Sequence, residues 1–171
     1  MRKAPLIAVL VLAAVAGAGS AWWLNREAKP GTELATRPAF SLPDLDNRVR
    51  KIAEWDGRVV LLNFWAPWCP PCRREIPAFM DLSKKYGDKG LTVVGVTIDT
   101  EQNAQNFVET YGIDYPILVG GEQGVTIAKA YGNKVGALPY TVVIDRQGHI
   151  RYVQGGELSY KAAEKVIKPL L

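Results

Sequence analysis

The stretch Asn63–Pro77 reads NFWAPWCPPCRREIP and contains both cysteines of the chain, Cys69 and Cys72. An apolar run leads into it and a helical pattern follows, which predicts a buried strand, a short loop and the start of a helix. A thiol at the start of a helix faces unpaired backbone N–H groups and the positive end of the helix dipole. Such surroundings lower the pKa of a cysteine from ~8.5 toward neutrality and so favour the thiolate. We therefore expect Cys69 to be an exposed nucleophile and Cys72, one turn later, to be a shielded resolving thiol.

The spacing of the two cysteines is compatible with a redox dithiol or with half of a metal site. A zinc site with four ligands cannot be assembled, because the chain has no second cysteine pair and a single histidine, His149. Copper(I) accepts fewer ligands, so a copper carrier with His149 as third ligand is the alternative. Because His149 lies in a predicted hairpin turn, a solvated side chain is the simpler interpretation. The redox dithiol is favoured.

The composition is that of one globular domain. A chain of 171 residues is long enough for one domain, and 48% hydrophobic with 22% charged residues excludes a disordered or low-complexity class. Without residues 1–24, which hold Arg2 and Lys3 and no acid, 19 basic residues face 17 acidic ones. A net charge of +2 is too small to indicate nucleic-acid binding.

The N-terminal segment Leu6–Leu24 has nineteen positions without a charge. As a helix it would span about 28 Å, close to the ~30 Å of a bilayer core. Arg2 and Lys3 precede it, and Trp22 and Trp23 close it. This pattern predicts an uncleaved membrane anchor over 1–24 with its N-terminus in the cytoplasm, and a cleaved signal peptide is the alternative. Either way, the domain that follows is expected in the periplasm or outside the cytoplasmic membrane.

Beyond a polar linker over 25–37, residues 38–171 have the alternating pattern of a single α/β domain. The order of strands and helices predicts a mixed sheet with helices on both faces and an N-terminal β-hairpin extension. Pro77 lies inside the first predicted helix of the domain, where it should cause a kink. The expected strands are 39–42, 49–52, 59–65, 91–98, 117–119, 141–145 and 150–154, and the expected helices are 70–86, 101–111, 123–131 and 159–171.

The segment Phe64–Cys72 (FWAPWCPPC) resembles the active-site segment of the thioredoxin superfamily. The two prolines between the cysteines, the continuation Arg73–Pro77 and the hairpin segment Ala39–Leu45 are similar to one branch. That branch is the membrane-anchored extracytoplasmic thiol–disulfide oxidoreductases of the TlpA/ResA type. The resemblance covers about 38–171 and implies a thioredoxin-like fold and thiol–disulfide exchange.

The same resemblance implies roles for further residues. The segment Gly136–Thr141 (GALPYT) stands where the family places its cis-proline loop, so Pro139 is implied to be cis and to face Cys69. From the sequence alone, a trans-proline that begins a strand is the alternative. The residues expected to contact a substrate are Trp68, Pro70, Pro71 and Leu138.

The same resemblance implies that Glu75 assists proton transfer at Cys72. Thioredoxin has a buried aspartate on the strand before the motif, and Asn63, which cannot titrate, holds that position here. The TlpA/ResA branch is thought to use a glutamate at the position of Glu75 instead. From its spacing alone, Glu75 fits an ordinary solvated helix carboxylate equally well.

The expected function is reduction of disulfides in exported proteins, with apocytochrome c as the client class that the resemblance implies. Neither of the two prolines donates a hydrogen bond to the thiolate, so a reducing or intermediate couple is expected. The protein should act as a monomer without organic cofactor or metal, re-reduced by a membrane thiol-transfer reductase. General periplasmic disulfide reduction and a docking domain without redox work are alternatives. A peroxiredoxin is disfavoured, because Leu62 and Ala66 stand where those enzymes carry proline and threonine or serine.

Overall fold

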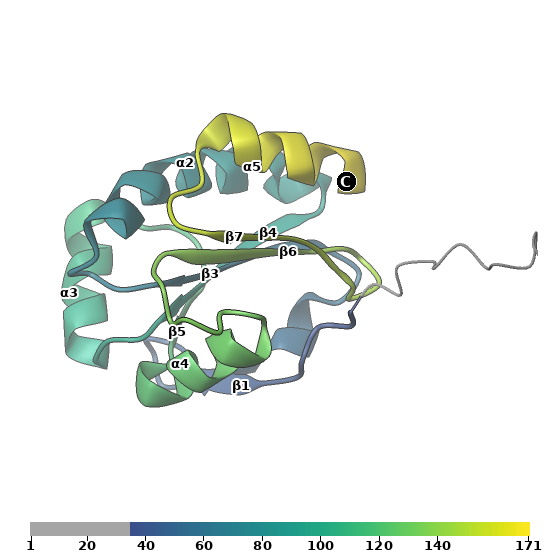
Figure 1. Ribbon diagram of the computed structural model, residues 1–171. Coiled ribbons are helices and arrows are strands. Elements are labelled where there is room, and N and C mark those ends of the chain that lie inside the picture. Colours follow the sequence, from purple (N-terminus) through teal and green to yellow (C-terminus); the bar gives the residue numbers. More distant parts are fainter. Residues whose placement is uncertain (1–34) are drawn as a thin grey trace, which may run out of the picture. The chain divides into compact units, whose positions relative to one another are not determined.

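The computed structural model describes residues 35–171 (Figure 1). The predicted anchor over 1–24 and most of the predicted linker over 25–37 lie outside these residues. Within 35–171, no helix is both long and apolar enough to cross a bilayer.

A five-stranded mixed sheet forms the centre of the domain, in the order β5-β4-β3-β6-β7. The central strand β3 pairs in parallel with β4 and antiparallel with β6. All seven residues of β3 are buried, as its apolar run predicts for a strand covered on both faces. The strands are β3 (Val59–Trp65), β4 (Leu91–Thr97), β5 (Ile117–Val119), β6 (Tyr140–Ile144) and β7 (Ile150–Gly155).

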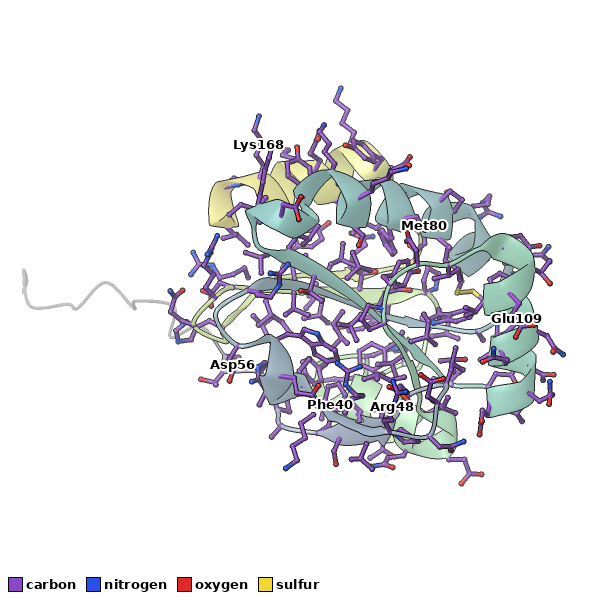
Figure 2. All side chains as sticks on the ribbon, turned by 180° about the vertical axis from the view of Figure 1, so that it is seen from behind. Phe40, Arg48, Asp56, Met80, Glu109 and Lys168 are labelled. Carbon is purple, nitrogen blue, oxygen red and sulfur yellow. A yellow bond between two sulfur atoms is a disulfide. The ribbon has the colours of Figure 1, made fainter. Side chains whose placement is uncertain are left out.

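Helices cover both faces of this sheet, as expected. In Figure 1, α2 and α5 lie above the sheet, while α4 and the hairpin of β1 and β2 lie below it. Side chains from both layers fill the space on either side of the sheet (Figure 2). The remaining elements are β1 (Ser41–Pro43), β2 (Val49–Lys51), α2 (Pro70–Tyr86), α3 (Glu101–Tyr111), α4 (Gly121–Ala130) and α5 (Tyr160–Ile167), with 3-10 turns η1 (Ile52–Trp55), η2 (Gly87–Lys89) and η3 (Lys168–Leu170).

Alternation along β3 decides which side chains face the active-site helix. Leu61 and Trp65 pack in the core cluster that includes α2, while Leu62 and Phe64 pack in the cluster on the opposite face. Because side chains alternate along a strand, Asn63 belongs to the face covered by α2. A polar residue is therefore buried beneath the helix that carries the cysteines.

The buried face of α2 is apolar except for one carboxyl group. Its buried residues follow the spacing of an amphipathic helix. Glu75 is the charged residue among them and is 1% exposed. The complete set is Cys72, Glu75, Ile76, Phe79, Leu82 and Tyr86.

The structure differs from the sequence prediction mainly at the ends of elements. Ile52 begins a 3-10 turn rather than ending a strand, because the Glu54 carboxylate accepts a hydrogen bond from the Lys51 N–H at 2.7 Å. The last α-helix ends at Ile167 and continues as a 3-10 turn that contains Pro169, whose ring nitrogen has no hydrogen to donate. Helix α2 is assigned as one helix through Pro77.

Candidate active site

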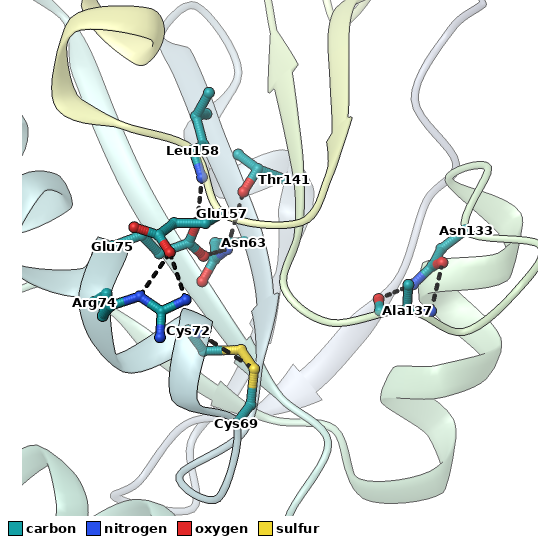
Figure 3. The surroundings of a disulfide bond; sticks show 10 residues. All are labelled: Asn63, Cys69, Cys72, Arg74, Glu75, Asn133, Ala137, Thr141, Glu157 and Leu158. Atoms are coloured by element: carbon teal, nitrogen blue, oxygen red, sulfur yellow. Dashed lines mark hydrogen bonds and ion pairs between the residues drawn. A yellow bond between two sulfur atoms is a disulfide. The ribbon is translucent and has the colours of Figure 1, made fainter.

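Cys69 and Cys72 form a disulfide at the start of α2, with a Cα–Cα distance of 5.3 Å (Figure 3). Cys69 is the N-cap residue of the helix, and its sulfur accepts a hydrogen bond from the Cys72 N–H at 3.3 Å. Pro70 and Pro71 occupy the first helical positions, where a backbone N–H would have no partner within the helix. The expected placement of Cys69 at the helix start is confirmed.

Both cysteines are buried in this disulfide form. Cys69 is 3% exposed and Cys72 is 0% exposed, so the expected exposed nucleophile is wrong for the oxidised state. The physical reason is that the Cys69 sulfur is bonded to that of Cys72, inside the core cluster beneath α2. The difference between the two thiols lies in their position, because Cys69 caps the helix while Cys72 lies within its first turn.

The expected substrate-contacting residues lie at one end of the sheet. Trp68 is 63% exposed directly before Cys69. The peptide bond between Leu138 and Pro139 is cis, as the resemblance implied, and Leu138 packs against the cluster that holds both cysteines. Because Tyr140 pairs with Phe64 near the end of β3, the loop before Tyr140 reaches the end of the sheet at which the disulfide lies. Pro70 is exposed and Pro71 is half-buried.

The loop before Leu138 is held by Asn133, a residue that no sequence motif above includes. Asn133 is 3% exposed and both donates to the Ala137 carbonyl at 2.8 Å and accepts from the Ala137 N–H at 3.1 Å (Figure 3). One side chain therefore closes the loop 133–137. Asparagine is a typical turn residue, so Asn133 directly after Gly132 was the sequence signal for a turn at this place.

Glu75 is buried beneath α2. The alternative that Glu75 is an ordinary solvated carboxylate on the helix surface is therefore wrong. Its Oε1 accepts a hydrogen bond from Asn63 Nδ2 at 2.8 Å, and its Oε2 accepts one from the Leu158 N–H at 2.9 Å (Figure 3). Burial raises the pKa of Glu75 from 4.5 to about 7, although these two hydrogen bonds act to lower it. The nearby charge of Glu157 raises the pKa further. The carboxyl group can therefore take up and release a proton near neutral pH.

Asn63 also links Glu75 to the neighbouring strand β6. Its Nδ2 donates a second hydrogen bond to Thr141 Oγ1 at 3.0 Å (Figure 3). The sequence shows that Asn63 cannot titrate, but it predicts neither of these two contacts. The sequence signal for Asn63 was a polar residue inside the apolar run of β3. The contact between Glu75 and Leu158 had no such signal, because it uses the backbone N–H of Leu158 and does not depend on which residue stands there.

The two arginines after Cys72 each bind a side chain from another part of the chain. Arg74 forms an ion pair with Glu157 at 2.7 Å (Figure 3). Arg73 donates a hydrogen bond to the Tyr111 hydroxyl and lies over its ring, 5.5 Å from the centroid. Beside them, Trp68 and the side chains of α3 line an open hollow of about 420 Å³. Trp68 is thus exposed and lines this hollow, and its contact with a substrate stays a prediction.

His149 lies far from the cysteines, which removes the third ligand of the copper interpretation. It follows β6, whose last residue Ile144 pairs with Val60 at the start of β3. The disulfide lies beyond the other end of β3, whose seven residues span roughly 20 Å at ~3.3 Å per residue. Across residues 35–171, no group of three or more metal-binding side chains is present.

Residues 35–153 match the AhpC/TSA family. The chain belongs to this family. Among its curated relatives is the thiol–disulfide oxidoreductase ResA of Geobacillus thermodenitrificans, 34% identical over 126 residues that cover 73% of this chain and 70% of ResA. Leu62 and Ala66, which disfavour a peroxidase, agree with that name.

Solved structures of thiol–disulfide proteins share this fold. A thioredoxin-family thiol:disulfide interchange protein from Chlorobium tepidum superposes with a TM-score of 0.73 at 28% identity, over 81% of this chain and 97% of that one. A secreted thiol-disulfide isomerase from Corynebacterium glutamicum has a TM-score of 0.75 at 27% identity, over 82% of this chain and 87% of its own. The protein is a thiol–disulfide oxidoreductase with a thioredoxin-like fold and a redox cysteine pair.

Proposed function

We propose that this oxidoreductase reduces disulfides in exported proteins outside the cytoplasmic membrane, with apocytochrome c as its client class. The observation that carries the reductive mechanism is the buried Glu75, whose pKa of about 7 suits a proton acceptor one turn after Cys72. The location rests on the apolar segment Leu6–Leu24 with its preceding basic residues. The secreted relative from Corynebacterium glutamicum agrees with this location.

The reaction begins with the reduced protein. The Cys69 thiolate attacks one sulfur of the substrate disulfide, so a bond forms between Cys69 and that sulfur while the other substrate sulfur leaves as a thiolate. Backbone N–H groups at the start of α2 stabilise the attacking thiolate, as the hydrogen bond from the Cys72 N–H to the Cys69 sulfur indicates. Trp68 and the loop that ends at Pro139 flank the bound chain.

The second step releases the substrate. Glu75 accepts the proton of the Cys72 thiol, and the resulting thiolate attacks the Cys69 sulfur. The disulfide between Cys69 and Cys72 forms, and the second substrate sulfur leaves with the electron pair of the mixed disulfide. The proton on Glu75 then returns to solvent. A membrane thiol-transfer reductase restores the dithiol, because the cycle consumes two electrons that the chain itself does not supply.

A trapping experiment tests this mechanism. Cys72→Ala removes the resolving thiol, so it should accumulate a mixed disulfide between Cys69 and the substrate. The substrate is an oxidised peptide with the Cys-x-x-Cys-His sequence of a haem-attachment site, and mass spectrometry measures the adduct. Cys69→Ala is the matched control and should form none under the same conditions.

Two outcomes would contradict the proposal. If Cys72→Ala forms no adduct with any disulfide peptide, the reductive mechanism fails. If it forms adducts equally fast with a peptide in which the two cysteines are moved apart, the assignment to apocytochrome c fails and general disulfide reduction is left.

A further inference from the structure

The hollow beside α3 contains both of the aromatic side chains that are exposed in residues 35–171. Trp68 is 63% exposed and Tyr111 is 42% exposed. Most aromatic side chains of the domain are buried in its core, so two exposed ones in a single depression are unusual. Exposed aromatic surface of this kind is typical of a site that another molecule covers.

The hollow lies next to the reactive cysteine along the chain. Trp65 of β3 pairs with Thr97 of β4, so both strands end at the same edge of the sheet. Trp68 and Asp99 follow these paired ends by three and two residues, and Cys69 comes directly after Trp68. A substrate chain bonded to Cys69 through a mixed disulfide therefore has its neighbouring residues within reach of the hollow.

Contacts inside the domain hold the aromatic wall of the hollow in place. Tyr111 stacks on Phe107 with 4.1 Å between the ring centroids, and Phe107 lies 5.2 Å from the Trp65 ring by the same measure. Phe107 also lines the hollow. Because this wall exists before a ligand arrives, binding orders few side chains and loses little free energy to that ordering.

The side-chain amides of α3 fit a polypeptide chain. Asn103 and Asn106 line the hollow three residues apart, so they lie on the same face of the helix. Asn103 donates to the Asp99 carboxylate at 2.9 Å. Asn106 accepts from Gln102 Nε2 at 2.9 Å. Among the described residues, no group bonds to the side-chain oxygen of Asn103 or to the side-chain nitrogen of Asn106. One acceptor and one donor are left, as the N–H and the C=O of a peptide group require.

The charge of the hollow differs between its two ends. Asp99 stands before the first turn of α3, whereas Tyr111 is its last residue and lies under the Arg73 guanidinium. From residue 98 to residue 128 the chain has five acidic residues and no lysine, arginine or histidine. The two ends are roughly 15 Å apart along a helix of 11 residues, which exceeds the Debye length of ~8 Å at physiological salt. Arg73 therefore neutralises little of the field at Asp99.

The Asp99 carboxylate is fixed in position and keeps one oxygen free for a ligand. Its Oδ1 accepts hydrogen bonds from the Thr100 N–H at 2.7 Å and from Asn103 Nδ2 at 2.9 Å. Within residues 35–171, no group donates to its Oδ2 and no basic side chain pairs with it. The dipole of α3 contributes about half a positive charge at this end, which the charges of Asp99 and Glu101 outweigh. This end of the hollow therefore attracts a cation.

We propose that the hollow holds the substrate chain beside its attacked cysteine, and that Asp99 selects a substrate with a lysine or arginine there. The aliphatic part of that side chain packs on the Trp68 ring, and its charged end reaches Asp99 Oδ2. Asp99 determines specificity and takes no part in the exchange of sulfur bonds. The inference rests on the proposed function, because the chain in the hollow is the substrate that Cys69 attacks.

Rates of mixed-disulfide formation with Cys72→Ala test this preference. Three oxidised peptides share one Cys-x-x-Cys-His sequence and carry lysine, glutamine or glutamate at the positions that flank it. The lysine peptide should react about two to five times faster than the glutamine peptide, as one exposed ion pair allows, and the glutamate peptide should be the slowest. In about 1 M salt the difference should shrink, because the Debye length falls to ~3 Å.

Variants in the same background assign the preference to Asp99. Asp99→Asn keeps the shape of the side chain and the Oδ1 acceptor but removes the charge, so the ratio of the lysine rate to the glutamine rate should fall to about one. Glu109→Gln is the matched control, because Glu109 is exposed on α3 (Figure 2) but does not line the hollow, and the ratio should stay unchanged. Trp68→Ala should slow all three peptides more than it slows alkylation by iodoacetamide, which is too small to fill the hollow.

NMR on the oxidised full-length protein gives the same comparison without thiol chemistry. Versions of the three peptides with serine in place of cysteine should shift the indole signal of Trp68 and the side-chain amide signals of Asn103 and Asn106. The lysine version should bind more tightly than the glutamate version.

Equal rates and equal affinities for the three peptides would overturn the inference, as would a loss of the rate ratio in Glu109→Gln as large as that in Asp99→Asn. A dimer that Trp68→Ala dissociates would assign the hollow to a second copy of the chain and overturn it too. The proposed function is judged separately. It fails if no peptide forms an adduct, in which case the NMR comparison still decides the inference, and it stands if all three peptides form adducts at one rate.

Discussion

Among single residues, Glu75 connects the stability of the protein most directly to pH. Its pKa is raised from 4.5 to about 7, chiefly by burial. Between these two values the folded protein holds a proton on Glu75 that the unfolded chain has released. The free energy of unfolding therefore falls as the pH rises through this window, by about 3 kcal/mol in total. Below about pH 4.5 the loss is absent, and above about pH 7 it is complete.

Glu75→Gln should remove this pH dependence, because an amide of similar shape does not ionise. We expect the variant to match the wild type near pH 4 and to exceed its free energy of unfolding by up to about 3 kcal/mol near pH 8. Urea unfolding of both oxidised proteins across this range measures the difference. Glu122→Gln, on the exposed surface of α4, is the control and should leave the pH dependence of the wild type unchanged. Parallel curves for wild type and Glu75→Gln would show that Glu75 does not ionise in this window.

At the scale of elements, the periodicity of the sequence predicts the sheet and its helices, because burial on one or two faces determines which positions are apolar. The apolar run of β3 and the helical spacing of α2 are of this kind. Hydrogen bonds between distant segments are not encoded in such patterns. Glu75 shares a face with Ile76 and Phe79, but a carboxylate on a helix is usually solvated, and its partner Leu158 uses a backbone group 83 positions away. The cysteine pair was predictable, whereas the buried contacts of Asn63 required the structure.

The contact between β3 and β4 offers a test of element packing at Gly95. A Cβ atom at this position would lie 2.6 Å from Ile117 Cδ1 and 2.9 Å from Trp65 Nε1. Since both neighbours are buried side chains, Gly95→Ala should lower the free energy of unfolding by about 1–3 kcal/mol. Urea unfolding measures the change. Gly87→Ala is the matched control, because nothing lies within 4 Å of its Cβ and its φ of −52° suits any residue, so no loss is expected there. Equal stability of both variants would mean that β4 and Trp65 can move apart freely.

At the scale of the whole domain, the described chain begins at the end of the sheet remote from the disulfide. Thr36 forms a β-bridge with His149, and the Arg37 N–H donates to the Gly148 carbonyl at 2.8 Å. Gly148 and His149 belong to the turn between β6 and β7, whereas Cys69 follows the opposite end of β3. A tether attached before residue 36 therefore joins the domain away from its reactive site.

This placement gives the anchor a testable consequence. With Leu6–Leu24 as a membrane helix, the full-length protein should sediment with membranes, resist extraction by salt and be released by detergent. Because the tether enters away from Cys69, the anchored protein and a protein freed by proteolysis in the linker should reduce a soluble disulfide peptide at the same rate. Fractionation, N-terminal sequencing and a peptide-reduction assay provide the measurements. A mature N-terminus at or near Ala21 or Trp22 would instead demonstrate a cleaved signal peptide, and a slower anchored form would show that the membrane obstructs the site.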